Sequence, residues 1–175
     1  MSLERQLSGL VLSMMKDNVE KMLCCRPTAI GMIGIAESGG SVTNLFFIEK
    51  EDTKLVETAS SPLLDEAFGQ LDAWLAGRVN TFSLPVAAVG SRFARQVWQA
   101  LLDIPYGSTA SYGEVALQIG APGAARAVGS ACRRNPLPII IPCHRVINSD
   151  GRMGRYLGGS QIKRYLLNME RRNCG

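Results

Sequence analysis

Histidine and paired cysteines are scarce in this sequence of 175 residues. It contains one histidine and five cysteines, none of which form a Cys-x-x-Cys pair. A structural zinc site needs four such ligands, and an odd number of cysteines does not suit a disulfide framework. We therefore expect no metal ion, no cofactor and reduced thiols at Cys24, Cys25, Cys132, Cys143 and Cys174.

Long hydrophobic runs are also missing. The longest, such as residues 137–142, are far shorter than the roughly 18 residues that a membrane span requires. The N-terminus lacks the basic, apolar and small-residue order of a signal peptide. Hydrophobic residues make up 46% of the chain and charged residues 19%, which is a globular balance. We expect a soluble, intracellular protein with no membrane partner.

Acidic residues are few in the second half of the chain. Residues 1–85 contain seven Lys and Arg against eleven Asp and Glu, whereas residues 86–175 contain twelve against four. Eleven of these twelve cations are arginines, whose planar guanidinium suits phosphate and nucleic-acid recognition. The second half is thus the part that would bind a polyanion, although a solvated basic surface gives the same composition.

The first half combines strands with one strong helix. Residues 1–22 carry apolar side chains at helical spacing and form either a short helix or a partly ordered arm. Two β-rich runs at 29–36 and 42–48 flank a glycine-rich turn and predict a hairpin. An apolar stripe over Leu63–Ala76 predicts a helix that buries this stripe in the core and ends at Gly77.

A loop-rich segment at 77–90 divides the chain into a candidate N-terminal domain, 1–90, and a candidate C-terminal domain, 91–175. In the second of these, apolar spacing predicts a helix that begins near Ser91 and stops before Ile104. The expected fold class is α+β: a small N-terminal α/β domain with a β-hairpin or sheet, followed by a mostly helical C-terminal domain that contains a helix-turn-helix.

Two short helices account for the predicted helix-turn-helix. Ser111 and Glu114 have the spacing of a capping box and predict a helix over 112–119. Pro122 suits the first turn of a second helix, expected over 123–133. This pattern fits a helix-turn-helix, but any helical hairpin has a similar one.

The second of these helices is rich in small side chains. They allow a close approach either of another helix within the protein or of a nucleic-acid groove, into which Arg126 would be the one long side chain to reach. The small residues that would allow this close approach include Ala125, Ala127 and Gly129.

The only histidine, His144, follows Cys143 directly, after a β-branched run at 137–142 that predicts a buried strand. An imidazole near a thiol can generate thiolate, which is the nucleophilic form. Because neighbouring residues on a straight strand point to opposite faces, proton transfer between them needs a turn or a bridging water. The alternatives are a structural dipeptide and a cysteine hydrolase, and the latter gives no reason for the basic helices.

Several ordered motifs are similar to those of the O6-alkylguanine-DNA alkyltransferases, also called methylated-DNA–protein-cysteine methyltransferases. The resemblance is strong from about residue 91 to 170. It is carried by Ser111-Tyr112-Gly113, Ala124-Ala125-Arg126-Ala127-Val128-Gly129, Asn135-Pro136, Pro142-Cys143-His144-Arg145-Val146, Tyr156-Leu157-Gly158-Gly159 and Leu166-Leu167 before Glu170.

This resemblance implies a DNA-repair reaction. Family members hold duplex DNA by a helix-turn-helix in the minor groove, flip out an alkylated guanine and move its alkyl group to a cysteine. It implies that Cys143 is the acceptor and that His144, acting through a water, deprotonates it. Glu170 would orient the histidine, and Tyr112 would offer its hydroxyl to the departing base. The thiol should lie in a small cavity that an extruded base can enter.

The resemblance also assigns the surrounding residues. Arg126 would fill the gap left by the flipped base, and the neighbouring DNA contacts would come from Ser111, Tyr112, Ala125, Ala127 and Gly129. Structural support would come from Asn135 and Arg145. Backbone groups of Cys143 and Val146 would bind the guanine edge. The substrate pocket would be lined by Val146, Tyr156, Leu157 and Gly158. The implied partner is double-stranded DNA containing O6-alkylguanine, bound by a monomer. The alternative is an alkyltransferase-like sensor, a class recognised by the absence of the cysteine that is present here.

Overall fold

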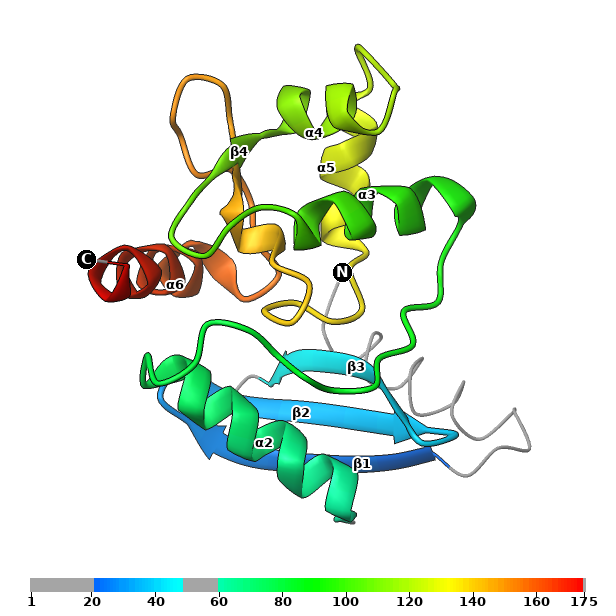
Figure 1. Ribbon diagram of the computed structural model, residues 1–175, viewed down its shortest axis with the longest axis vertical. Coiled ribbons are helices and arrows are strands. Elements are labelled where there is room, and N and C mark those ends of the chain that lie inside the picture. The colour runs from blue at the N-terminus through cyan, green and yellow to red at the C-terminus, as the bar shows by residue number, and fades with distance from the viewer. Residues whose placement is uncertain (1–20, 49–59, 175) are drawn as a thin grey trace.

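The computed structural model describes residues 21–48 and 60–174 (Figure 1). The helix or arm predicted for 1–22 falls outside these ranges except for its last two residues, which belong to a strand. Within the described ranges a three-stranded sheet with one helix precedes a helical C-terminal half, so that the α+β class is confirmed.

The sheet is antiparallel with the order β1-β2-β3, formed by β1 (Lys21–Thr28), β2 (Gly31–Ser38) and β3 (Ser41–Ile48). The pair β2–β3 is the predicted hairpin, closed where Ser38 faces Ser41. The prediction missed β1. That strand lies at an edge of the sheet, where the missing N–H of Pro27 is tolerated, and its sequence lacks clear apolar alternation.

Helix α2 (Pro62–Leu75) matches the predicted helix to within one residue at each end. The hydroxyl of Ser61 caps it by accepting a hydrogen bond from the Leu64 amide at 3.1 Å. Figure 1 places α2 across one face of the sheet. The apolar stripe of the helix is buried there, comprising Leu64, Ala67, Phe68, Leu71, Trp74 and Leu75.

The segment predicted as a linker is partly attached to the sheet. The Val42 amide donates to the Pro85 carbonyl at 2.8 Å, and the Ala87 amide donates to the Val42 carbonyl at 2.9 Å. Strand β3 also reaches the C-terminal half, because the Leu45 amide donates to the Pro136 carbonyl at 2.8 Å. Buried side chains from both halves form one continuous core, and the boundary at residue 90 stays a prediction.

Three helices pack together in the C-terminal half: α3 (Arg92–Leu102), α4 (Tyr112–Gln118) and α5 (Ala125–Arg133). The indole N–H of Trp98 on α3 donates to the Ala131 carbonyl of α5 at 3.0 Å. The helix α6 (Gly159–Asn173) follows at the C-terminal end of the chain (Figure 1).

The two short helices α4 and α5 are the predicted helical pair. The capping box is present: the Ser111 hydroxyl accepts from the Glu114 amide at 3.1 Å, and the Glu114 carboxylate accepts from the Ser111 amide at 2.6 Å. The second helix begins at Ala125 and not at Gly123 as predicted. Gly123 has φ +83°, a left-handed conformation that a helix cannot contain, so Pro122 lies in the turn before the helix.

The predicted strand at 137–142 is wrong. The segment is a compact turn in which the Ile141 amide donates to the Leu137 carbonyl at 2.8 Å, and Ile139 has φ +77°. Prolines at 136, 138 and 142 have no N–H for a strand ladder, which explains why a β-branched run forms no strand here. Immediately afterwards comes the short 3₁₀ helix η2 (Cys143–Arg145). It is followed by β5 (Val146–Ile147), which pairs in parallel with β4 (Ala110–Ser111).

Replacing Ser111 by alanine should weaken the start of α4. The cap hydrogen bond to the Glu114 amide is lost, and such a change costs about 1 kcal/mol of the free energy of unfolding. Urea denaturation of Ser111→Ala measures the loss, with Ser108→Ala in the exposed loop before it as the control. Equal unfolding free energies for the two variants would contradict the capping role.

Candidate functional site

The site is built on η2, whose three side chains are all buried in the C-terminal half. The 3₁₀ conformation replaces the strand geometry expected at Cys143 and His144, so these two neighbours do not point to opposite faces as they would on a strand. The turn is held against α6 (Gly159–Asn173), which carries Glu170.

The thiol of Cys143 is only 4% exposed and is held by Asn135. The Asn135 side-chain amide donates to Sγ at 3.2 Å and to the Ile141 carbonyl at 2.8 Å, while its Oδ1 accepts from the Leu137 amide at 3.0 Å. Asn135 follows α5 directly. It therefore links the end of the second short helix to the segment that carries the cysteine.

Burial decides the protonation of this thiol. It raises the pKa of Cys143 to about 11, against the lowering effects of the Asn135 hydrogen bond and the nearby Lys163 charge. At neutral pH the thiol is therefore protonated. Reaction as a thiolate requires a base that removes its proton.

The imidazole of His144 is fully buried and hydrogen-bonded to Glu170, with Nε2 and Oε1 2.8 Å apart. A carboxylate only accepts, so Nε2 carries the hydrogen and donates it. Nδ1 is also buried and has no hydrogen-bond partner in the described part of the chain. Burial lowers the pKa of His144, against the raising effect of Glu170, which leaves a neutral ring whose free lone pair can accept a proton.

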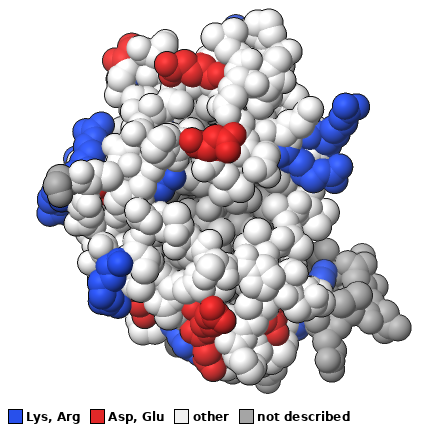
Figure 2. All heavy atoms as spheres, viewed as in Figure 1, with Lys and Arg blue, Asp and Glu red and all other residues white. Residues whose placement is uncertain are grey.

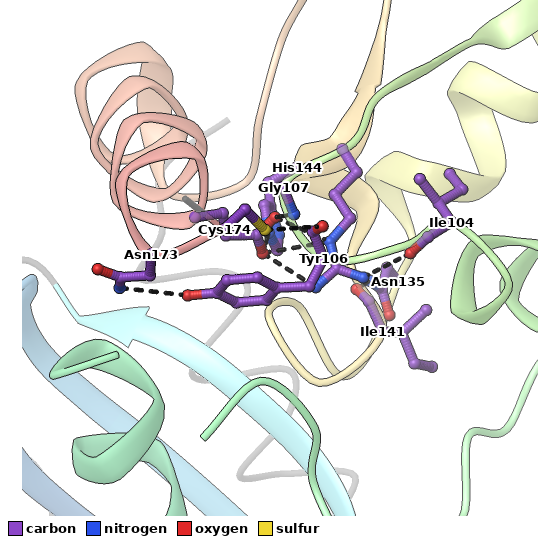
Figure 3. Close-up of polar contacts among 10 residues, drawn as sticks. Ile104, Tyr106, Gly107, Asn135, Ile141, His144, Asn173 and Cys174 are labelled. Atoms are coloured by element: carbon purple, nitrogen blue, oxygen red, sulfur yellow. Dashed lines mark hydrogen bonds and ion pairs between the residues drawn. The ribbon is translucent and has the colours of Figure 1, made fainter. Parts of the chain in front are cut away.

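Glu170 collects donors from three segments. Its carboxylate accepts from the Arg145 guanidinium at 3.0 to 3.2 Å and from the Gly107 amide at 3.0 Å, in addition to His144 (Figure 3). Burial alone raises the pKa of Glu170, but the hydrogen bonds from His144 and Arg145 outweigh burial and hold the pKa below its ordinary value. The carboxylate therefore stays ionised.

Arg145 is fixed on its other side as well. One guanidinium nitrogen donates to the Ile104 carbonyl at 2.7 Å, and the guanidinium lies 5.6 Å from the centre of the Tyr106 ring. Figure 3 labels Ile104, Tyr106, Gly107 and His144, the neighbours of this network that lie near one another. Arg145 thus connects this loop, η2 and α6.

Sequence reasoning missed Lys163, which is fully buried on α6. Its ammonium donates to the Val146 carbonyl at 2.6 Å, and burial lowers its pKa. The signal was available in the helical spacing, because Lys163 lies three and seven residues before Leu166 and Glu170, on the same buried face. The Val146 amide in turn donates to the Cys143 carbonyl. Both backbone groups expected to read guanine are thus engaged within the protein.

Most of the predicted DNA-contact residues lie around a surface cavity of about 670 Å³. Tyr112 borders it next to Gly154, where a Cβ would lie only 2.9 Å from the tyrosine oxygen. Burial raises the pKa of Tyr112, so its phenol is a hydrogen-bond donor at neutral pH. The full lining is Tyr112, Ala125, Arg126, Gly129, Ser130, Arg133, Asn148, Gly154 and Arg155. The predicted contacts Ser111 and Ala127 are not part of this lining.

Three predicted pocket residues border another cavity, of about 740 Å³, between the sheet and the C-terminal half. Tyr156 there makes an edge-to-face contact with Phe47 of β3, at 5.7 Å between ring centres. Leu157, Gly158 and Asn135 lie along the same cavity. Cys143 lines neither of these two cavities, and only 4% of its surface is exposed.

Charges are unevenly distributed over the surface. Figure 2 shows one face, on which the basic side chains gather mainly toward the two sides and the acidic ones near the top, middle and lower edge. The basic side chains thus form no single continuous patch on this face. Arg126 is exposed at the cavity beside Tyr112.

Features of other site types are absent from the described residues. In the ranges 21–48 and 60–174, His, Cys, Asp and Glu side chains form no cluster of three or more that could hold a metal ion. No helix among those described is long and apolar enough to cross a bilayer.

Known proteins are similar to this chain in sequence and in fold. Residues 92–172 match the family model described as the DNA-binding domain of 6-O-methylguanine DNA methyltransferase. Methylated-DNA–protein-cysteine methyltransferase from Mycobacterium leprae is 45% identical over 86% of this chain and 93% of its own. The constitutive enzyme of that name from Bacillus subtilis is 44% identical over 82% and 92%. The crystal structure of Mycobacterium tuberculosis OGT in complex with DNA matches with a TM-score of 0.79 and 43% identity, covering 87% of this chain and 94% of that one.

The buried imidazole should make stability depend on pH. His144 has a lowered pKa in the folded protein and an ordinary pKa of about 6.5 when unfolded. Unfolding below that pH therefore takes up a proton. As the pH is lowered below about 6.5, the free energy of unfolding should fall by at most about 1.4 kcal/mol per pH unit. Urea denaturation between pH 7 and 5.5 measures this slope.

His144→Asn provides the control, because the chain has no other histidine. The variant should lose the slope in this pH window. An equal slope in the variant and the unchanged protein would show that the imidazole is not the group responsible.

Proposed function

We propose that this protein, which belongs to the family of methylated-DNA–protein-cysteine methyltransferases, repairs DNA by moving the alkyl group of O6-alkylguanine onto Cys143. The observation that carries the proposal is the Asn135-bonded thiol of Cys143 next to the buried His144–Glu170 pair. These residues lie in the part of the chain that matches the family's DNA-binding domain.

The chemistry is a direct displacement at carbon. Nδ1 of His144 takes the proton of Cys143 through a water molecule, and the thiolate forms a bond to the alkyl carbon as the bond from that carbon to O6 breaks. The electron pair of the broken bond stays on the guanine, where the phenol of Tyr112 offsets the developing charge by hydrogen bonding. The guanine ring then takes up one proton, and release of the proton held by His144 to water balances it. Restored guanine and a thioether are the products.

The protonation states explain why a base is required. A thiol whose pKa is raised to about 11 does not ionise by itself at neutral pH, and the neutral His144 has a free lone pair. The imidazolium that forms would be stabilised by Glu170, which is already hydrogen-bonded to it. A thioether has no route back to thiolate, so each protein molecule would act once.

DNA binding is assigned to α4 and α5, which we place in the minor groove of duplex DNA. The small side chains of α5 allow the close approach, and Arg126 would occupy the space left by the flipped base. Flipping costs a few kcal/mol, part of which a stacked guanidinium recovers. We propose that the protein works as a monomer inside the cell, where its DNA substrate is.

A sensor without transfer activity is not favoured. Such proteins lack the acceptor cysteine, whereas this chain has Cys143 together with a base and the carboxylate partner of that base. The cysteine hydrolase considered from the sequence leaves the match to a DNA-binding domain without a role.

Intact-protein mass measurement tests the transfer. Mixed with a duplex that contains O6-methylguanine, the protein should gain one methyl group, and Cys143→Ser should gain none. Cys132→Ser is the matched control because Cys132 is another buried thiol with a raised pKa, and it should be methylated normally. Absence of a methylated product with the unchanged protein, or its formation with Cys143→Ser, would disprove the proposal.

Arg126→Ala tests the proposed role in base flipping. The rate of transfer from duplex DNA should fall about tenfold, whereas transfer from free O6-methylguanine, which needs no flipping, should change little. Arg164→Ala, which alters an exposed arginine of α6 away from the cavity, serves as the control. Equal losses of Arg126→Ala on both substrates would contradict the assignment.

A further inference from the structure

The imidazole of His144 is packed against two aromatic rings. Trp74 from α2 lies 5.8 Å away between ring centres with an interplanar angle of 73°, and Tyr156 lies 6.3 Å away at 83°. Both contacts are edge-to-face. The two rings come from distant parts of the chain, one from the N-terminal half and the other from the segment before α6.

These contacts fix something that the hydrogen bond to Glu170 leaves free. The imidazole is held at Nε2 by this hydrogen bond and at Cγ by its covalent attachment. It could still rotate about the axis through these two atoms, which would change the direction of the Nδ1 lone pair. Two rings packed nearly at right angles to the imidazole oppose this rotation. The direction of the Nδ1 lone pair therefore depends on aromatic packing as well as on the carboxylate.

Trp74 is itself firmly held. It is 1% exposed, and its ring contacts Phe82 at 5.9 Å and Tyr106 at 6.0 Å between centres. Tyr106 precedes Gly107, whose amide donates to Glu170. The indole thus packs against both the imidazole and the segment that binds its carboxylate partner.

We propose that Trp74 is a positioning residue for alkyl transfer. Through it, the N-terminal half of the chain orients the imidazole of His144 in the C-terminal half and excludes water from it. The inference rests on the function proposed above. Trp74 contacts no reacting atom and acts through His144 alone.

The ring contributes no charge of its own. The charged groups that act on His144 belong to η2 and α6 and are Glu170, Arg145 and Lys163. The thiol of the preceding residue Cys143 and the phenol of Tyr156, whose ring contacts the imidazole, are neutral. Since burial is what lowers the pKa of His144, removal of the indole would admit water and move that pKa toward its ordinary value of about 6.5.

The experiment uses the fact that His144 is the only histidine of the chain, so its ring signals in an NMR spectrum need no assignment among several. In the unchanged protein the signals of the ring protons should be displaced by the ring currents of the two aromatic neighbours, and the nitrogen shifts should report the form with hydrogen on Nε2. Trp74→Leu should weaken the displacement and raise the pKa of His144. Trp74→Phe, which keeps a ring, should restore part of both.

Single-turnover methyl transfer measured against pH gives the functional reading. Protonation of His144 stops the reaction, so the rate of Trp74→Leu should begin to fall at a higher pH than that of the unchanged protein. Loosened orientation should also slow the reaction at pH 8 by about tenfold. Trp98→Phe is the control: it disturbs a buried tryptophan of α3 outside the His144 contacts and should leave the pH dependence unchanged.

Defined results overturn the inference. Identical pH dependence of Trp74→Leu and the unchanged protein, or the same shift in Trp98→Phe, would do so. If Trp74→Leu fails to fold, unperturbed ring-proton shifts of His144 in the unchanged protein still refute the packing. Absence of methyl transfer in the unchanged protein would refute the proposed function alone, since the NMR titration of His144 is independent of DNA.

Discussion

The carboxylate of Glu170 is the group on which this site depends. An ionised carboxylate buried without partners is prohibitively unstable, so its position is acceptable only because the donors of His144, Arg145 and Gly107 surround it. Those donors come from η2 and from the loop after α3, while Glu170 belongs to α6. One charge therefore holds together three segments that are far apart in the sequence.

Arg145 changes what this carboxylate does for the histidine. If Glu170 faced the imidazole alone, its charge would favour the protonated ring. The Arg145 guanidinium shares the same carboxylate and lowers the pKa of His144, as burial does, and the ring stays neutral. Sequence reasoning assigned Arg145 a supporting role. Its contacts indicate that it also balances the charge that would otherwise convert the base into its conjugate acid.

The parts of the fold that were predictable are those specified by neighbouring residues. The cap at Ser61 and the Ser111–Glu114 capping box define helix starts locally, and the apolar spacing of α2 defines its buried face. Local rules failed at 137–142, where the prolines and the left-handed Ile139 take a conformation that depends on packing around the chain. For Lys163, helical spacing could indicate a buried position, but only the tertiary structure gives its partner, the Val146 carbonyl.

The buried thiol of Cys143 fits its proposed role as a nucleophile that is used once. Oxidation of cysteine follows thiolate character and exposure, and Cys143 has neither: it is 4% exposed, and burial raises its pKa to about 11. A permanently ionised thiolate would react faster but would also be lost to oxidants before any lesion arrived. In the proposed reaction the proton stays on the sulfur of Cys143 until the neutral imidazole of His144 removes it. The burial that raises the pKa of this thiol belongs to the same buried region as the Glu170 network.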